Sequence, residues 1–299
     1  MGESAKVIDA TERLGVIHGG GKKLPPNNKS DRRRVDPIKE VKDIRAIEDY
    51  LDTKIKDARN STSKKIAARN KLLFIVGTRT GFRVSDLERF TWGLIFNMKG
   101  EFHTTPESVK EIKTKKIREV ILSDTIKKAF LEYIEIVDPD IIKDNYIFIG
   151  NKTLYELYNV GTDNKIIDDI TMDITTEGYS LKTKHRGLTK IELEEKKKYL
   201  DRMNIRYSVR RFHIGDAGIE DMIKAATNAC NIKGHYACRS LRKTYAYRAY
   251  QQALEIGMYE IDALDLVRDF LNHWNSRTTL KYLGLSHERD LKFMNDCEW

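Results

Sequence analysis

Apolar residues recur at helical spacing over most of the chain, which predicts a mainly helical protein. The predicted helices are 37–58, 64–77, 124–137, 190–203, 218–231, 240–256 and 259–272. Asp36 is the predicted N-cap of the first helix, because Pro37 follows at a position where proline fits a helix start.

One region instead alternates apolar and polar residues, as short antiparallel strands do. It consists of "TWGLIFNM" from residue 91, a turn at Lys99–Gly100, and "SVKEIKTKKIREVILSD". Residues 145–150, "NYIFIG", add a brief extended segment. The expected fold class is therefore α+β, mainly helical with a small antiparallel sheet.

The pattern also indicates how the chain is organised. Residues 1–35 lack a hydrophobic period and are rich in Gly, Pro and basic side chains, which predicts a flexible basic tail. One domain is expected over 36–285, with 155–208 as an insertion that carries no readable signature. The last segment, 286–299, is expected to dock either on its own domain or on a neighbouring copy.

Composition narrows the class of protein. Of 299 residues, 40% are hydrophobic and 33% charged, and the formal net charge is +9, which favours a polyanionic partner. The cysteines, Cys230, Cys238 and Cys297, form no CxxC pair, so no zinc site or disulfide framework is expected. No apolar run reaches the ~20 residues of a membrane span, and we expect a cytoplasmic protein without a membrane partner.

Two stretches suggest chemistry on their own. Arg83 follows the predicted end of a helix at Thr80–Gly81 and precedes Ser85-x-x-Glu88, which has capping-box spacing. An arginine beside a helix N-terminus suits an anion. In "LNHWNSRTTLKYLGL", Tyr282 is either a buried tyrosine or a nucleophile with His273 as its companion, and the local sequence fits both readings.

Four segments in this order resemble the tyrosine recombinase (phage integrase) family. "TGFRVSDL" resembles the first arginine box, and "KTKKIREVILS" resembles the lysine hairpin. "RSLRKTYAYRAYQQ" resembles the second arginine box, and "LNHWNSRTTLKYLGL" the final box with its nine-position spacing from histidine to tyrosine. The resemblance covers roughly 36–150 and 209–285.

The resemblance implies a role for each residue, and the roles fit the chemistry of phosphodiester cleavage. Arg83 and Arg242 would clamp the scissile phosphate, since guanidinium forks match phosphate oxygens. Lys113 would protonate the leaving 5′ oxygen and His273 would donate to a phosphate oxygen. Tyr282 would attack and form a 3′-phosphotyrosyl link, with no metal or cofactor. The implied catalytic set is Arg83, Lys113, Arg239, Arg242, His273 and Tyr282.

The sequence departs from the family pattern at several points. Arg239 replaces the usual histidine of the second box, and arginine cannot act as a base. Asn272 replaces the glycine before His273. The ordered part before Arg83 is too short for the usual core-binding domain, so that domain is expected to be absent. The insertion either replaces this DNA grip or is a solvated excursion; its basic candidates are Lys182, Lys184, His185, Arg186, Arg210 and Arg211. Further candidates for DNA contact are Lys110, Lys115, Lys116 and Lys243.

The sequence thus predicts a site-specific recombinase of a phage or mobile element that acts on double-stranded DNA. Such a protein is expected to assemble as a tetramer on paired sites and to work at the nucleoid. Arg239 keeps open a DNA-binding regulator that has lost strand exchange. A topoisomerase-like or hairpin telomere-resolving relative is a third reading.

Overall fold

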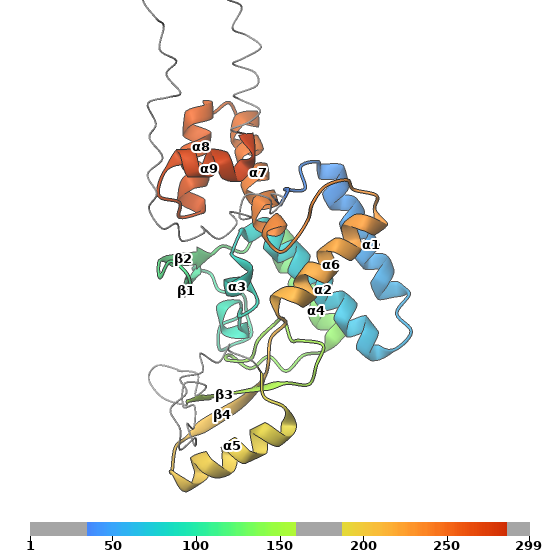
Figure 1. Cartoon of the computed structure of the whole chain (residues 1–299), viewed down its shortest axis with the longest axis vertical. Coiled ribbons are helices and arrows are strands. Elements are labelled where there is room, and N and C mark those ends of the chain that lie inside the picture. The colour runs from blue at the N-terminus through green and yellow to red at the C-terminus, as the bar shows by residue number, and fades with distance from the viewer. Residues whose placement is uncertain (1–34, 160–186, 286–299) are drawn as a thin grey trace, which may run out of the picture. The chain divides into compact units, whose positions relative to one another are not determined.

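The computed structural model describes residues 35–159 and 187–285. The predicted tail up to residue 34, the C-terminal segment 286–299 and insertion residues such as Lys182 and Lys184 lie outside the described residues. Within the described ranges the protein is mainly helical with small antiparallel sheets (Figure 1), so the expected fold class is confirmed.

The elements follow one another in a simple order. The helices are α1 (Val41–Lys56), α2 (Ser61–Thr80), α3 (Val84–Leu87), the 3-10 helix η2 (Trp92–Leu94), α4 (Asp124–Val137), α5 (Lys190–Arg202), α6 (Asp216–Ala229), α7 (Arg239–Glu255), α8 (Glu260–Phe270) and α9 (Ser276–Leu283). The strands are β1 (Glu107–Lys110), β2 (Ile117–Val120), β3 (Tyr155–Asn159) and β4 (Tyr207–Arg211). They form two separate antiparallel pairs, β1 with β2 and β3 with β4.

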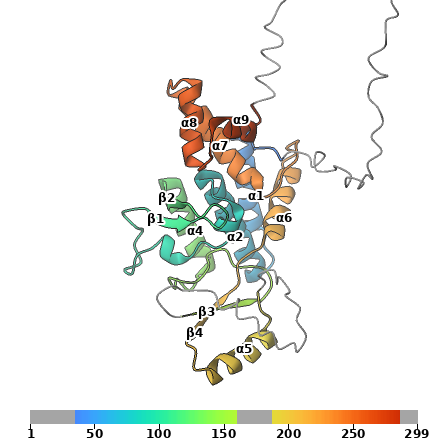
Figure 2. The ribbon, with the colours of Figure 1, turned by 60° about the vertical axis from the view of Figure 1, so that its left-hand side comes forward.

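The larger hydrophobic cluster is built around α2. This helix has buried residues along its length, among them Leu73, Phe74 and Val76, because α1, α4 and α7 all pack against it. Helix α1 buries one face, and it contacts α6 as well as α2. We call this group of helices, with the β1–β2 hairpin beside it, the central cluster (Figure 2).

The last three helices form a second hydrophobic cluster, here called the C-terminal cluster. Helices α7, α8 and α9 pack on one another around Ala246, Val267, Leu271 and Leu283. Helix α7 belongs to both clusters, since Leu241 near its start lies in the central cluster. The second arginine box therefore lies where the two clusters join.

The insertion has a small core of its own. Strands β3 and β4 pair in register from Tyr155 opposite Arg211 to Asn159 opposite Tyr207, and α5 packs on β3. A threonine and a glutamate form a capping box at the start of α5, between Thr189 and Glu192. The buried residues of this small core are Leu157, Leu188, Leu193 and Leu200.

The predicted start of the first helix is wrong. Helix α1 begins at Val41, and Asp36 and Pro37 precede it in an extended segment. The Asp36 carboxylate accepts from the backbone N–H of His235 at 2.8 Å, and the N–H of Ile38 donates to Thr244. These tertiary hydrogen bonds replace the local cap that the sequence suggested.

The strand and cap predictions around 85–102 are also wrong in part. Trp92–Leu94 is a 3-10 helix, and only a single bridge joins Phe96 to Phe102. Arg83 is the N-cap of α3, and Glu88 lies at its C-terminal end, so no capping box forms between Ser85 and Glu88. The lysine hairpin and the turn at Gly100 are confirmed.

No helix in the described residues is long and apolar enough to cross a membrane.

Candidate active site

The site begins at the end of α2, where Gly81 terminates the helix in the left-handed conformation, with φ of 63°. Its carbonyl oxygen accepts hydrogen bonds from Arg118 at 2.8 Å and from Arg242 at 2.7 Å. Glycine is required here for two reasons: the positive φ, and a Tyr245 ring atom that a Cβ would meet at 2.2 Å. This turn places Arg83 two residues later.

We expect Gly81→Ala to lower the free energy of unfolding by roughly 2–4 kcal/mol, from backbone strain and overpacking against Tyr245. Gly100→Ala is the matched control, since Gly100 also has a positive φ, 78°, but open space around it. We expect about 1 kcal/mol there. Urea unfolding of both variants measures the difference, and equal losses would contradict the packing argument.

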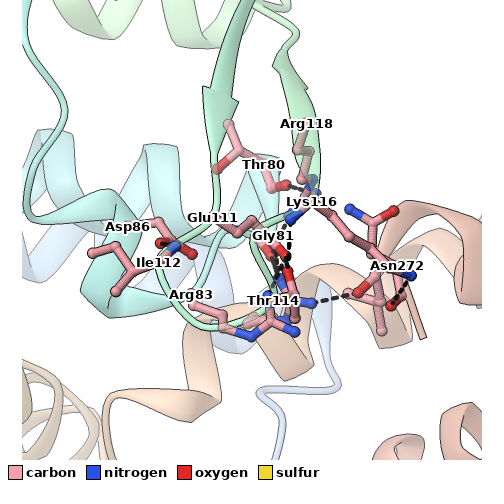
Figure 3. Close-up of polar contacts among 12 residues, drawn as sticks. Thr80, Gly81, Arg83, Asp86, Glu111, Ile112, Thr114, Lys116, Arg118 and Asn272 are labelled. Carbon is pink, nitrogen blue, oxygen red and sulfur yellow. Dashed lines mark hydrogen bonds and ion pairs between the residues drawn. The ribbon is translucent and has the colours of Figure 1, made fainter. Parts of the chain in front are cut away.

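Arg83 lies against a buried carboxylate from the hairpin. Its Nη1 is 2.5 Å from Oε2 of Glu111, a residue with no exposed surface (Figure 3). Burial alone would raise the pKa of Glu111, but the Thr114 hydroxyl and the Arg83 and Arg242 guanidinia outweigh it and lower the pKa. Glu111 is therefore ionised at neutral pH.

Arg242 connects the two clusters. It is buried, and its guanidinium donates to the carbonyl of Gly81 and, at 2.7 Å, to that of Leu271. Its Nη1 is also 3.8 Å from Glu111 Oε1. Burial, and the positive charges of Arg83 and Arg118, lower the pKa of Arg242 to about 10, so it remains a cation.

The β1–β2 hairpin brings its lysine-rich turn to the same place. Lys116 donates from Nζ to the carbonyl of Asn272 at 3.3 Å. The Asp86 carboxylate accepts from the N–H of Ile112 at 2.8 Å and so ties the turn to α3. Lys113 is exposed and has no hydrogen-bond or ion-pair partner among the described residues.

The connection from α8 to α9 positions His273. Asn272 has φ of 51°, and the N–H groups of Asn272 and His273 donate back to Asp269 and Arg268, which is a Schellman motif. Asparagine tolerates this left-handed conformation, which explains how it replaces a glycine. The His273 ring then turns inward, with Nδ1 at 3.1 Å from the buried Thr279 hydroxyl.

Tyr282 lies on α9 beside this histidine. The two ring centroids are 5.2 Å apart with the rings at 75°, and Lys243 lies 5.3 Å above the tyrosine ring. Burial raises the pKa of Tyr282, although the nearby guanidinia of Arg242, Arg239 and Arg83 oppose it. The phenol is therefore protonated at rest, and its proton must leave during any attack.

His273 is neutral at rest, because burial and the charges of Arg242 and Arg83 lower its pKa from 6.5 to about 4. A neutral imidazole keeps one N–H that can donate. Between these pH values the unfolded chain binds a proton that the folded chain excludes, so stability falls as pH drops through this window.

We expect this effect to cost about 1–2 kcal/mol between pH 7 and pH 4, after discounting for the partial exposure of the ring. His273→Gln removes the titrating group, and its unfolding free energy should fall less over the same range. Urea unfolding of both proteins at several pH values gives the difference directly. Parallel curves would show that the pKa of His273 is not depressed.

The structure thus brings together Arg83, Lys116, Arg239, Arg242, Lys243, His273 and Tyr282, while Lys110, Lys113 and Lys115 lie on the adjoining hairpin. Arg210 and Arg211 lie elsewhere, on β4. The Arg210 side chain is mostly buried in an ion pair with Glu156 at 2.7 Å and also donates to Tyr146. We therefore propose that Arg210 anchors the insertion instead of contacting DNA.

Three polar residues of the site were missed by the sequence argument: Glu111, Arg118 and Thr279. Glu111 did carry a signal, because it is an acid inside the otherwise basic run "KEIKTKK". Thr279 lies in the final box, six positions after His273, and was interpreted only as part of that motif. Arg118 carried no signal, since its role depends on a contact with Gly81 across the fold. The described residues hold no cluster of His, Cys, Asp or Glu that could bind a metal ion.

The comparisons with known proteins agree with the family expectation. The model of the phage integrase family matches residues 40–289, most of the chain, and the protein therefore belongs to this family, that of the tyrosine recombinases. Search of the curated proteins gave no match.

Two solved structures are similar at low identity. One is XerH site-specific recombinase bound to palindromic difH substrate in a post-cleavage complex, with 15% identity and a TM-score of 0.49 over 92% of this chain and 57% of that one. The other is XerA recombinase, with 15% identity and a TM-score of 0.44 over 92% of this chain and 68% of that one. The protein thus spans little more than half the length of the XerH chain.

Proposed function

We propose that this protein is a site-specific DNA recombinase that cuts and rejoins duplex DNA through a 3′-phosphotyrosyl intermediate. The observation that supports it best is the convergence of Arg83, Arg242, His273 and Tyr282 from four distant segments. Phosphoryl transfer needs donors for the charge on the phosphate and an in-line nucleophile, and these side chains supply both.

The proposed reaction has two transesterifications. The Tyr282 oxygen attacks the scissile phosphorus, the bond to the 5′ oxygen breaks, and the strand is held as a 3′-phosphotyrosyl ester. Arg83 and Arg242 bind the phosphate oxygens, and the N–H of His273 donates to one of them. The phenol proton passes to solvent water as the attack proceeds, and the nearby positive charge of Arg239 stabilises the negative charge that develops on the Tyr282 oxygen, since arginine cannot take the proton itself. In the second step a free 5′ hydroxyl of the partner strand attacks the phosphotyrosyl phosphorus. The bond to the Tyr282 oxygen breaks, the tyrosine is released and the two strands are joined.

The hairpin supplies the proton for the leaving oxygen. We assign this role to Lys113, with Lys116 as the neighbour that already contacts Asn272. Lys113→Ala should slow cleavage about 10²–10⁴-fold. A substrate with sulfur in place of the bridging 5′ oxygen needs no proton donor and should restore the rate. If only Lys116→Ala is slowed and rescued in this way, the assignment moves to Lys116.

A DNA-binding regulator is the second candidate, favoured by Arg239 in place of histidine. A covalent-capture experiment separates the two. The protein first selects duplexes from a random-sequence library. The selected duplexes are nicked near the bound site and incubated with the protein, and the products are resolved under denaturing conditions. A covalent adduct whose peptide maps to Tyr282 supports the recombinase. Tight specific binding without any adduct supports the regulator.

Assembly and cellular context follow from the same proposal. Strand exchange between two duplexes requires four active sites, so we propose a tetramer on paired sites, acting at the nucleoid. Sedimentation of the protein with paired duplexes tests the stoichiometry. Lys110, Lys115, Lys116 and Lys243 are proposed to contact the DNA backbone, and binding should weaken with salt.

A further inference from the structure

The ionised Glu111 carboxylate lies between the two arginines assigned to the phosphate. Oε2 is 2.5 Å from Arg83 Nη1 (Figure 3). Oε1 is 3.8 Å from Arg242 Nη1. A carboxylate offers guanidinium groups the same pair of charged oxygens that a phosphodiester offers. Glu111 and a bound phosphate would therefore compete for the same donors.

The carboxylate fits this place incompletely. Oε1 is buried, yet it accepts no hydrogen bond from any described residue, and the Arg242 guanidinium lies 3.8 Å away from it. Buried carboxylate oxygens are normally satisfied by donors, so this arrangement is a poor final state for a buried anion. An anion placed with better access to both guanidinia would displace Glu111 at modest cost.

Glu111 also controls the lysine turn. Its N–H donates to the carbonyl of Lys116 at 2.9 Å, and its carbonyl accepts from the N–H of Lys115 at 2.9 Å. Its side chain accepts from the Thr114 hydroxyl. Because the Thr114 hydroxyl of this turn donates to the Glu111 side chain, displacing that side chain removes one of the contacts that hold the turn in place.

We propose that Glu111 is an internal substitute for the scissile phosphate, which holds Arg83, Arg242 and the lysine turn in a resting arrangement until DNA displaces it. The inference rests on the proposed function for the identity of the anion. Competition for the anion site can be tested without strand transfer. Displacement of the carboxylate frees both guanidinia and repositions the turn that carries Lys113.

A simpler role makes the opposite prediction. If Glu111 is a permanent positioning residue that orients the two guanidinia while phosphate binds elsewhere on them, removing its charge weakens both binding and cleavage. If it is a competitor, removing its charge strengthens binding. Glu111→Gln keeps the size of the side chain and removes only the charge.

The test uses the full-length protein with two readouts. The first is the shift of the thermal unfolding midpoint with inorganic phosphate, and the second is affinity for the selected duplex over a range of salt. We expect Glu111→Gln to bind the duplex about tenfold more tightly, a difference of about 1.4 kcal/mol. We also expect phosphate to raise its midpoint more than that of the natural protein. Unchanged or weaker binding in both readouts overturns the proposal.

Two further variants keep the result interpretable. Glu156→Gln makes the same change in another fully buried glutamate, which pairs with Arg210, and should leave DNA affinity unchanged. Glu111→Asp retracts the charge by one methylene and should give an intermediate gain if the Gln variant does not fold. Tighter phosphate binding with no covalent adduct would support this inference and contradict strand transfer. An adduct with weaker binding in Glu111→Gln would do the reverse.

Discussion

Replacing Tyr282 by phenylalanine is expected to abolish the covalent protein–DNA adduct, a loss of at least about 10³-fold in single-turnover cleavage. The substitution removes one oxygen atom and leaves the ring beside His273, so the packing of α9 is preserved. Affinity for the selected duplex should stay within about threefold, because phosphate binding depends on the arginines. Denaturing gels and equilibrium binding on the same preparation measure both quantities.

The control for this prediction is Tyr259→Phe. Tyr259 is 80% exposed at the start of α8, and removing its hydroxyl should leave adduct formation unchanged. An adduct that persists in Tyr282→Phe would assign the nucleophile to another residue. Loss of DNA binding together with the adduct would point to damage to the fold instead.

The second large effect is expected from Arg242→Ala, in both cleavage and stability. Cleavage should fall about 10²–10⁴-fold, because one of the two phosphate guanidinia is lost. The unfolding free energy should fall by roughly 2–4 kcal/mol, since the carbonyl of Leu271 loses its donor and Glu111 loses part of its charge balance. Single-turnover cleavage below the melting temperature separates the two losses.

Arg248→Ala is the matched control on the same helix. Arg248 makes a surface ion pair with Glu255 at 3.8 Å, which should contribute less than about 1 kcal/mol. Arg242→Lys keeps the positive charge but cannot donate to Gly81 and Leu271 as a fork does. If it cleaves at the natural rate, the bidentate role assigned to Arg242 is wrong.

The chain's local patterns were sufficient for most helices and for the hairpin. The periodicity of α4 reflects one buried face, and such a pattern is local. In β2 the inner face carries Arg118 and Val120, while Ile117 is 71% exposed. The predicted start of α1 was wrong because Asp36 and Ile38 form hydrogen bonds with His235 and Thr244, about two hundred positions away in the chain. No short stretch of the sequence contains both partners of these hydrogen bonds.

The residues of the candidate site also fall into those that the local sequence predicted and those that it did not. Tyr282 and the cationic residues other than Arg118 were predicted because each lies in a segment that resembles a family box. Their assignment as catalytic remains a proposal for the experiments above. Glu111 was missed because its importance arises from total burial between two arginines, and burial of a charged residue in a lysine-rich turn runs against its usual preference. The pairing that makes this burial tolerable exists only in three dimensions.

The division of the site between two hydrophobic clusters has a consequence for timing. Arg83 and the lysine turn belong with the central cluster, while His273 and Tyr282 belong with the C-terminal cluster. Helix α7 joins them, and Arg242 donates to one carbonyl on each side, Gly81 and Leu271. On the proposed function, a partner that tilts the C-terminal cluster would move Tyr282 away from the scissile phosphate without moving Arg83 or the lysine turn. In the proposed tetramer, such a tilt would leave one copy inactive while its neighbour is active, so that the strands are cut one after the other.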